Sequence, residues 1–245
     1  YWGFNWEDPT VGGTKNKLLR SAIAKAIDKN QISEVIYQGI RKPASGLLPP
    51  GIPGFKAGQG LTSGRDLDGA QADYKKWLAL GNKTPSAIRL SYNDGAGWDK
   101  VASIIVANLK DVGIPAKLDP FPADGTYFSK MRSGKGQIIR AGWFADYPIA
   151  DNFLYPLLHT KTIDGDNLER YSSKAFDALV DSARSSTNKS FAQSQYRRAE
   201  VQALKVDVVM VPTVNRGVAV VLAASTSTFP ITPLGMVVYD QIVKN

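Results

Sequence analysis

The sequence contains no cysteine and only one histidine, His159. Without cysteine, disulfides and thiolate-bound metals are excluded, and a single histidine cannot build a histidine-based metal centre. We expect His159 at a helix surface or in a helix cap. Two close aspartate pairs, Asp66 with Asp68 and Asp164 with Asp166, lack the spacing of an EF-hand. The sequence therefore predicts no metal site and no cofactor.

Several familiar signatures are also missing. The sequence has no apolar run of 18 residues, so it predicts no membrane-spanning helix. It has no phosphate-binding glycine loop, no H-E-x-x-H and no G-x-S-x-G motif. No signal peptide is visible, and the opening residues 1–6 read as the middle of a strand. We therefore expect a non-enzymatic protein and a piece of a longer chain.

Charge and composition are those of a soluble globular protein. The 245 residues are 43% hydrophobic and 21% charged, with a formal net charge of +8. The basic residues are scattered, and their densest groups, at 15–20 and 197–198, are short. A nucleic-acid-binding surface usually has a basic stripe with interleaved aromatics. We therefore predict no nucleic-acid partner.

Hydrophobic periodicity in the first half predicts alternating strands and helices. Apolar residues spaced by three and four indicate helices, and alternating ones indicate strands. Asp28 with Gln31 forms a capping box, Ala72, Trp77 and Leu80 are expected inward, and Gly113 is an expected C-cap. The expected elements are strand 1–6, helices 17–26 and 28–39, a proline-rich loop 43–64, helix 68–80, strand 88–92, helix 98–112 and strand 114–118.

The second half predicts further helices and a buried strand. Ser173 is an expected N-cap, and the apolar run 206–214 is typical of a buried strand. The expected elements are helix 124–131, strand 137–143, helix 152–158, a helix after Ser173, helix 191–205, strand 206–214 with 217–222 as a partner, and loop 223–235. The β-α-β order predicts an α/β fold with a parallel or mixed sheet.

One stretch brings a cation, aromatics and an anion together at the end of the expected strand 137–143. Arg140, Trp143, Phe144 and Asp146 lie within seven residues. In an extended segment Trp143 and Ala145 share one face, and Phe144 and Asp146 share the other. A carboxylate beside bulky aromatics can recognise a cationic group. Equally, the stretch can be a corner whose aromatics fill the core.

The order of several short motifs resembles the peptide- and oligopeptide-binding proteins of ABC importers, family 5 of the extracytoplasmic solute-binding proteins. Each motif is modest alone, but together they follow the family's order along nearly the whole chain. They are Gly-Phe-Asn at 3–5, Leu-Arg-Ser-Ala-Ile-Ala-Lys-Ala-Ile-Asp at 19–28, Gly-Leu-Leu-Pro-Pro-Gly-Ile-Pro-Gly-Phe at 46–55, Leu-Lys-Asp-Val-Gly-Ile at 109–114, Gly-Trp-Phe-Ala-Asp-Tyr-Pro at 142–148 and Phe-Asp-Ala-Leu at 176–179.

The resemblance implies a fold. Members have two lobes joined by crossing strands, and the matching motifs belong to the second lobe. Residues 1–245 are therefore expected to be one ligand-binding lobe of the type II periplasmic-binding-protein kind, with a mixed sheet flanked by helices and the first lobe largely absent. The strand at 206–214 would lead back towards that first lobe. A natural single-lobe relative is the alternative.

The resemblance also implies roles for site residues. Asp146 matches the aspartate that pairs with a peptide's α-ammonium, and Trp143 matches a tryptophan that lines a side-chain pocket. Arg140 matches an arginine that meets a peptide carboxylate in some members. Phe144, at a variable position, and Tyr147 complete the candidate set. The chain departs from the family after Tyr147, where Pro-Ile-Ala-Asp stands in place of Pro-Asp-Pro.

The implied function is peptide capture by closure of two lobes, followed by docking on the membrane permease outside the cytoplasm. Relatives that bind oligosaccharides, nickel complexes or haem keep other small solutes open, because a fold does not fix its ligand. Trp143 and Phe144 would then stack on sugar rings. A hydrolase-like enzyme is the third possibility, and the sequence offers it no nucleophile–base set.

Overall fold

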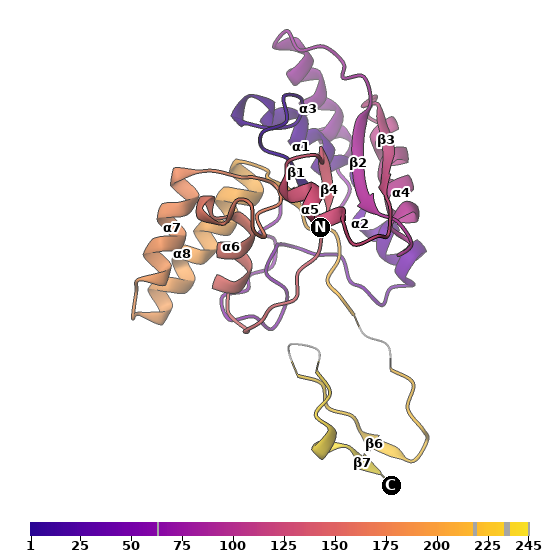
Figure 1. Cartoon of the computed structure of the whole chain (residues 1–245), viewed down its shortest axis with the longest axis vertical. Coiled ribbons are helices and arrows are strands. Elements are labelled where there is room, and N and C mark those ends of the chain that lie inside the picture. Colours follow the sequence, from indigo (N-terminus) through magenta and orange to yellow (C-terminus); the bar gives the residue numbers. More distant parts are fainter. Residues whose placement is uncertain (63, 218–219, 233–235, 245) are drawn as a thin grey trace.

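A five-stranded mixed sheet forms the centre of the molecule. The computed structural model describes residues 1–62, 64–217, 220–232 and 236–244 (Figure 1). The strand order is β3-β2-β4-β1-β5. β2 runs parallel to β3 and β4, and β1 runs antiparallel to β4 and β5. The strands are β1 (Trp2–Phe4), β2 (Ile88–Asn93), β3 (Ala116–Phe121), β4 (Ile138–Arg140) and β5 (Met210–Val211). The predicted α/β fold with a mixed sheet is confirmed.

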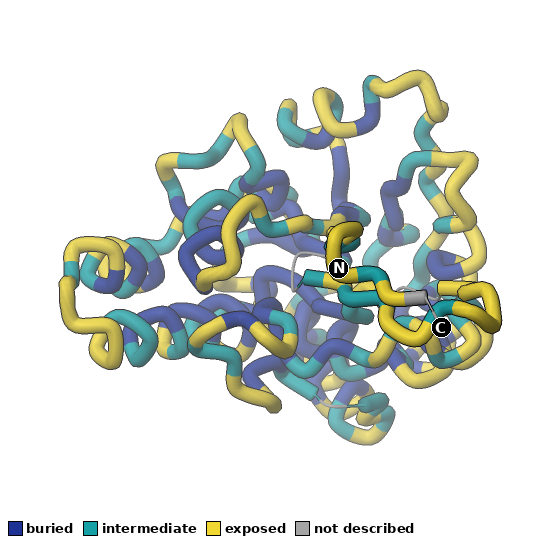
Figure 2. Tube along the Cα trace, turned by 90° about the horizontal axis from the view of Figure 1, so that it is seen from below, coloured by how far each residue is buried: buried dark blue, intermediate teal, exposed yellow. Residues whose placement is uncertain are grey.

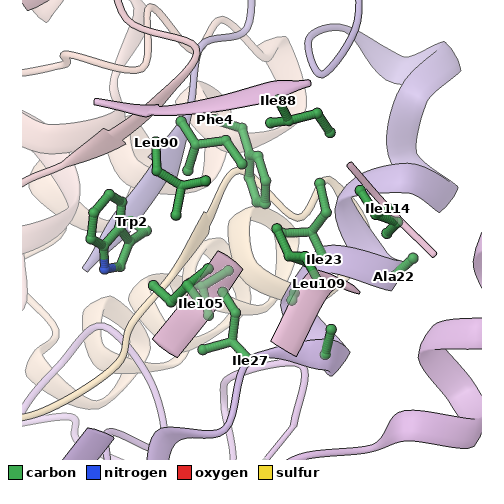
Figure 3. Close-up of a cluster of buried hydrophobic side chains, with 14 of the residues drawn as sticks. Trp2, Phe4, Ala22, Ile23, Ile27, Ile88, Leu90, Ile105, Leu109 and Ile114 are labelled. Atoms are coloured by element: carbon green, nitrogen blue, oxygen red, sulfur yellow. The ribbon is translucent and has the colours of Figure 1, made fainter. Parts of the chain in front are cut away.

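Three helices and the sheet enclose the larger core. They are α1 (Lys17–Ala26), α3 (Leu67–Ala79) and α4 (Trp98–Lys110). In Figure 3 Phe4 from β1 and Leu90 from β2 face Ile23 of α1 and Ile105 of α4. These side chains are almost fully removed from solvent. The cluster therefore holds the strand ends in fixed positions.

Helix caps explain where several of these helices begin. Asp28 accepts a hydrogen bond from the Gln31 amide, as predicted, and opens α2 (Lys29–Gln31), which continues into the π-helical turn η2 (Ile32–Ile36). Asp66 accepts from the Gly69 amide at the start of α3. The inward face of α3 differs from the prediction: Ala72 and Leu80 are exposed, and Ala70, Tyr74 and Trp77 are buried.

A second helical cluster lies beside the sheet, as the orange helices in Figure 1 show. Ser173 caps its second helix through the Phe176 amide, as predicted. The helices are α6 (Asp151–Leu158), α7 (Lys174–Arg184) and α8 (Lys189–Val201), which continues into the turn η4 (Gln202–Val206). The shorter α5 (Tyr127–Arg132) precedes β4 and begins three residues later than predicted. Two 3₁₀ turns, η1 (Thr14–Asn16) and η3 (Thr160–Thr162), complete the body.

The proline-rich segment 43–64 is irregular throughout its described residues, as predicted. Two buried charged side chains hold it against the body. Glu200 of α8 accepts hydrogen bonds from the Leu47 and Leu48 amides at 2.7 and 3.0 Å. The Lys29 ammonium donates to the carbonyls of Ala44 and Thr62. A loop without regular structure is thereby fixed at both ends.

The interior gathers segments that are distant in sequence. Figure 2 shows the buried residues along the inner parts of the trace, with exposed residues in the peripheral loops. The guanidinium of Arg20, fully buried, donates to the carbonyls of Val11, Gly13, Asp207 and Val208. Because a guanidinium carries donors on all its nitrogens, one side chain can satisfy several carbonyls at once.

The segment after α8, from residue 206 onwards, departs most from the prediction. Residues 208–213 are buried, but only Met210–Val211 form a strand, because Val208 has a φ of +52° and Pro212 cannot donate to a ladder. The segment predicted as loop contains β6 (Thr226–Thr228), which pairs with β7 (Val243–Lys244) after the turn η5 (Tyr239–Gln241). The predicted partner strand 217–222 includes residues 218–219, which lie outside the described residues. The C-terminal segment runs away from the body (Figure 1).

Candidate functional site

A pocket of about 710 Å³ opens where the sheet, the 40–52 segment and the segment after β4 meet. Its wall combines aromatic and cationic side chains with backbone. Arg140, Trp143 and Phe144, three of the predicted site residues, line it. Further lining residues are Trp2, Tyr37, Arg41, Lys42, Trp98, Phe153 and Arg216. A volume of several hundred cubic ångströms suits a small organic ligand.

Arg140 stands at the end of β4, where three contacts fix it. Its guanidinium carbon lies 3.4 Å from the centroid of the Trp98 ring, and Nη1 donates to Asn93 Oδ1 at 3.1 Å. The Tyr127 hydroxyl lies 2.8 Å from the Arg140 carbonyl. Burial lowers the pKa of Arg140 to about 10, and the positive charge of Arg41 adds to this shift. The guanidinium remains charged at neutral pH and presents a fixed cation to the pocket.

Asn152, on the first turn of α6, organises the segment that follows β4. Its Oδ1 accepts from Trp143 Nε1 at 3.2 Å and from the Asp146 amide at 2.8 Å. Its Nδ2 donates to the Asp146 carboxylate at 3.3 Å. Asn152 itself is 4% exposed. One buried amide therefore sets the positions of both the tryptophan and the aspartate.

The faces of the segment alternate as predicted. Trp143 and Ala145 pack against the helical cluster, and Phe144 and Asp146 are exposed. The exposed ring of Phe144 is covered by Arg216, whose guanidinium carbon lies 4.4 Å from the ring centroid. Trp143 fits both interpretations of this stretch, core filling and ligand recognition, because it packs against the core and also lines the pocket.

Asp146 and Tyr147 lie outside the pocket lining. The Asp146 carboxylate is exposed and belongs to no ion pair with a described residue, and it follows Ala145, which does line the pocket. The Tyr147 hydroxyl donates to Asp151 Oδ2 at 3.0 Å, on the first turn of α6. The structure thus places the anion at the rim and the tyrosine in a helix-anchoring contact.

His159 has a different position from the one expected at a helix surface. It is 1% exposed. Its Nδ1 accepts from the Lys161 amide, which makes it the cap of η3, and its Nε2 lies 3.3 Å from Asp181 Oδ1. Capping was predicted correctly, but the burial was not, because it depends on the packing of α7. His159 does not line the pocket.

The described residues contain neither a metal-binding cluster nor a membrane-spanning helix. No group of three His, Cys, Asp or Glu side chains lies close enough together there to hold a metal ion. None of the helices described combines the length and apolar character that a bilayer-spanning helix requires.

Comparison with known families decides what kind of protein carries this pocket. Residues 1–165 match the model of the bacterial extracellular solute-binding proteins, family 5, middle region. The chain belongs to this family. The match covers β1 to β4, α6 and the pocket-lining segments before residue 165. Members of the family are solute-binding proteins of transport systems.

Individual relatives agree with the family assignment. The chain is 29% identical over 215 residues to haem-binding protein A of Haemophilus influenzae, a match that covers 82% of this chain and 36% of the relative. The peptide-bound DppA of Helicobacter pylori, an ABC transporter-associated periplasmic binding protein, has a TM-score of 0.75 at 26% identity, covering 87% of this chain and 40% of that one.

HbpA2 of Haemophilus parasuis supports the fold alone, with a TM-score of 0.84 at 22% identity over 100% of this chain and 48% of that one. The chain spans less than half the length of these three proteins.

Sequence reasoning found the segment after β4 but missed most of the pocket. Asn152 carries a weak signal, since it stands at a helix start near the motif. Tyr37, Arg41 and Arg216 come from segments whose sequences mark no site, and only tertiary structure brings them to Phe144 and Arg140.

Proposed function

We propose that this chain is the second, ligand-binding lobe of an extracytoplasmic receptor that captures short peptides for an ABC importer. The observation that carries the proposal is the pocket wall built by the segment after β4, in which Arg140, Trp143 and Phe144 line the pocket and are followed by the exposed Asp146. The similarity to the peptide-bound DppA of Helicobacter pylori adds support. The lobe would bind its ligand without catalysis.

Asp146 would take the peptide's α-ammonium. Its carboxylate is exposed and oriented by Asn152, and no described cation neutralises it. An ammonium that donates to a carboxylate forms a strong, charge-assisted hydrogen bond. When a second lobe excludes water, that bond would offset the cost of removing both charges from solvent.

Trp143, Phe144 and Arg140 would receive the rest of the peptide. The two aromatic rings offer apolar walls for side chains, and the charged Arg140 offers donors to a carboxylate. Tyr147 would contribute indirectly, because its hydrogen bond to Asp151 would hold the residues next to Asp146 against α6. The missing first lobe would close the pocket, and the closed receptor would dock on the membrane permease.

Calorimetry on the complete receptor tests the role of Asp146. We expect tri-alanine to bind and N-acetylated tri-alanine to bind at least tenfold more weakly, since a lost charged hydrogen bond costs about 1.5–3 kcal/mol. Asp146→Asn should lower the affinity for free tri-alanine until it is close to the affinity for N-acetylated tri-alanine. Asp68→Asn, an exposed aspartate on α3, is the matched control. Equal binding of both peptides by the wild type would remove the proposed role.

Haem is a second candidate, favoured by the similarity to haem-binding protein A of Haemophilus influenzae and by the aromatic, cationic wall of the pocket. A haem iron takes an axial ligand such as histidine, cysteine, methionine or tyrosine. The only histidine is buried outside the pocket. Titration with haemin distinguishes this candidate: a stoichiometric shift of the Soret band that Tyr37→Phe abolishes would favour haem over peptide.

A further inference from the structure

Three arginine–aromatic pairs surround the pocket. Arg140 lies on Trp98 at 3.4 Å, Arg41 on Tyr37 at 4.3 Å and Arg216 on Phe144 at 4.4 Å, each distance measured from the guanidinium carbon to the ring centroid. All six side chains line the same pocket. The described residues contain six cation–π pairs, and three of them lie around this one cavity.

The charge of the wall has one sign. Arg41, Lys42, Arg140 and Arg216 line the pocket, and no Asp or Glu is among the described lining residues. None of these four cations forms an ion pair with a described residue. In Arg140 the buried Nε also has no hydrogen-bond partner among the described residues. Unpaired cations gathered in a partly buried cavity repel one another, and an anion relieves that repulsion.

Stacking decides which part of each arginine meets a ligand. A guanidinium that lies over an aromatic ring uses its face, while its N–H donors point outwards in its plane. Those donors match the two oxygens of a carboxylate. The stacked rings also limit the rotamers of the arginines, so less conformational entropy is lost when a carboxylate binds.

Two segments that are distant in sequence hold Arg41 and Arg216 near each other. Ala44 donates to the Thr213 carbonyl and Asn215 donates to the Lys42 carbonyl, around an antiparallel bridge between Pro43 and Val214. Gly217 passes so close to the Ile40 carbonyl that a Cβ there would clash with it. The Ser33 hydroxyl donates to the Arg41 carbonyl at 2.7 Å. The cationic wall is therefore a built feature of the body.

We propose that the receptor prefers acidic peptides, those with a carboxylate in addition to the C-terminal one, and that Arg41 and Arg216 set this preference. The inference rests on the proposed peptide-binding function and extends it to a substrate class. The α-ammonium would lie at the rim on Asp146, and the carboxylates would lie in the pocket. A basic side chain would meet four cations there and would be rejected.

Calorimetry with Ala-Glu-Ala, Ala-Gln-Ala and Ala-Lys-Ala tests the preference, since the first two peptides have nearly the same shape and differ in charge. We expect the wild-type complete receptor to bind Ala-Glu-Ala about tenfold or more tightly than Ala-Gln-Ala, the effect of one charged hydrogen bond. The ratio should fall as salt is raised. Ala-Lys-Ala should bind most weakly.

The double variant Arg41→Gln/Arg216→Gln assigns the preference to these residues. It should lower the ratio of the Ala-Glu-Ala affinity to the Ala-Gln-Ala affinity to below about twofold, because the contact that distinguishes the glutamate carboxylate from the glutamine amide is lost. Lys75→Gln/Lys83→Gln removes two exposed charges outside the pocket and should keep the full ratio.

The outcomes separate the two proposals. Equal affinities for Ala-Glu-Ala and Ala-Gln-Ala in the wild type would overturn the acidic preference and leave peptide capture standing. A preference that persists in the double variant would overturn the role of Arg41 and Arg216. No binding of any of the three peptides would overturn the peptide function and the preference with it.

Discussion

At the scale of single residues, Asn152 connects the two side chains of greatest interest. Its amide contacts Trp143 Nε1 and both the backbone and carboxylate of Asp146. A buried amide that makes three hydrogen bonds is costly to replace, because its partners lose theirs as well. The position of the candidate site is therefore set by a residue that touches no ligand in the proposed account.

Asn152→Ala should weaken tri-alanine binding by about tenfold, because both Trp143 and Asp146 lose their anchor. Asn152→Asp is the matched comparison, since it keeps the acceptor oxygen for Trp143 and the Asp146 amide. Calorimetry measures both, and circular dichroism melting checks that both variants fold. Wild-type affinity in Asn152→Ala would show that the segment needs no such anchor.

Glu169 is a second residue of interest, because it is a fully buried carboxyl group whose two oxygens have no partner among the described residues. It packs against Gly3 of β1, where a Cβ would clash with it. Burial raises its pKa to about 8, partly opposed by its own backbone amide and by the nearby amino group of Tyr1. The folded chain therefore holds a proton on Glu169 where the unfolded chain has lost it.

This proton gives a pH prediction with a defined sign. Between pH 4.5 and 8 the folded state binds more protons at Glu169 than the unfolded state, so the contribution of Glu169 to stability falls as pH rises. Glu169→Gln cannot ionise, so its free energy of unfolding should rise relative to that of the wild type across this window, by up to about 1.4 kcal/mol per pH unit.

Urea denaturation of the wild type and of Glu169→Gln at several pH values measures the difference in their free energies of unfolding. Groups that titrate equally in both proteins do not contribute to that difference. Glu34 is an exposed glutamate, so the free energy of unfolding of Glu34→Gln should depend on pH in the same way as that of the wild type. A pH-independent difference between Glu169→Gln and the wild type would mean that Glu169 is ionised in the folded state.

At the scale of elements, the 43–64 segment shows how an irregular loop becomes part of a site. All residues from Gly46 to Ile52 except Leu48 line the pocket, and Glu200 of α8 accepts hydrogen bonds from the Leu47 and Leu48 amides. Gly46 is required there, because a Cβ would lie 2.6 Å from Glu200 Oε1. The pocket wall therefore depends on a carboxylate from an element more than 140 residues away in the chain.

Removing that carboxylate should loosen the wall locally. We expect Glu200→Ala to raise hydrogen–deuterium exchange at the Leu47 and Leu48 amides by about tenfold or more, since two amides lose a buried acceptor. Glu200→Gln keeps an acceptor oxygen and should show a smaller increase. Mass spectrometry of peptides that span 44–52 measures the effect. Unchanged exchange in Glu200→Ala would mean that other contacts hold the loop.

The same scale explains what the sequence could and could not predict. Local signals found the caps at Asp28 and Ser173 and the helices with strong periodicity, because capping and amphipathic spacing act within a few residues. They overextended the strand at 206–214, because burial alone gave an apolar run. They also missed β6 and β7, which are separated by 14 residues of chain without a hairpin signal.

At the scale of the whole molecule, the candidate site was only partly predictable. The motif after β4 located one wall through its family resemblance. The adjoining wall, with Arg41 and Arg216, depends on pairing between the 40–44 and 213–217 segments, and sequence periodicity carries no information about such contacts. The charge of the pocket is therefore a property of the fold and could be read only from the structure.

The proposed receptor would bind its peptide in one direction only. A negative rim at Asp146 and a cationic interior would bind a peptide with its amino end outwards and its carboxylates inwards. Closure of a second lobe over this pocket would enclose the peptide.

A crystal structure of the complete receptor with Ala-Glu-Ala tests this account most directly. The account predicts the peptide in the pocket, its ammonium within hydrogen-bonding distance of the Asp146 carboxylate and its glutamate carboxylate against Arg41 or Arg216. A peptide bound elsewhere on the protein, or with its ammonium away from Asp146, would contradict it.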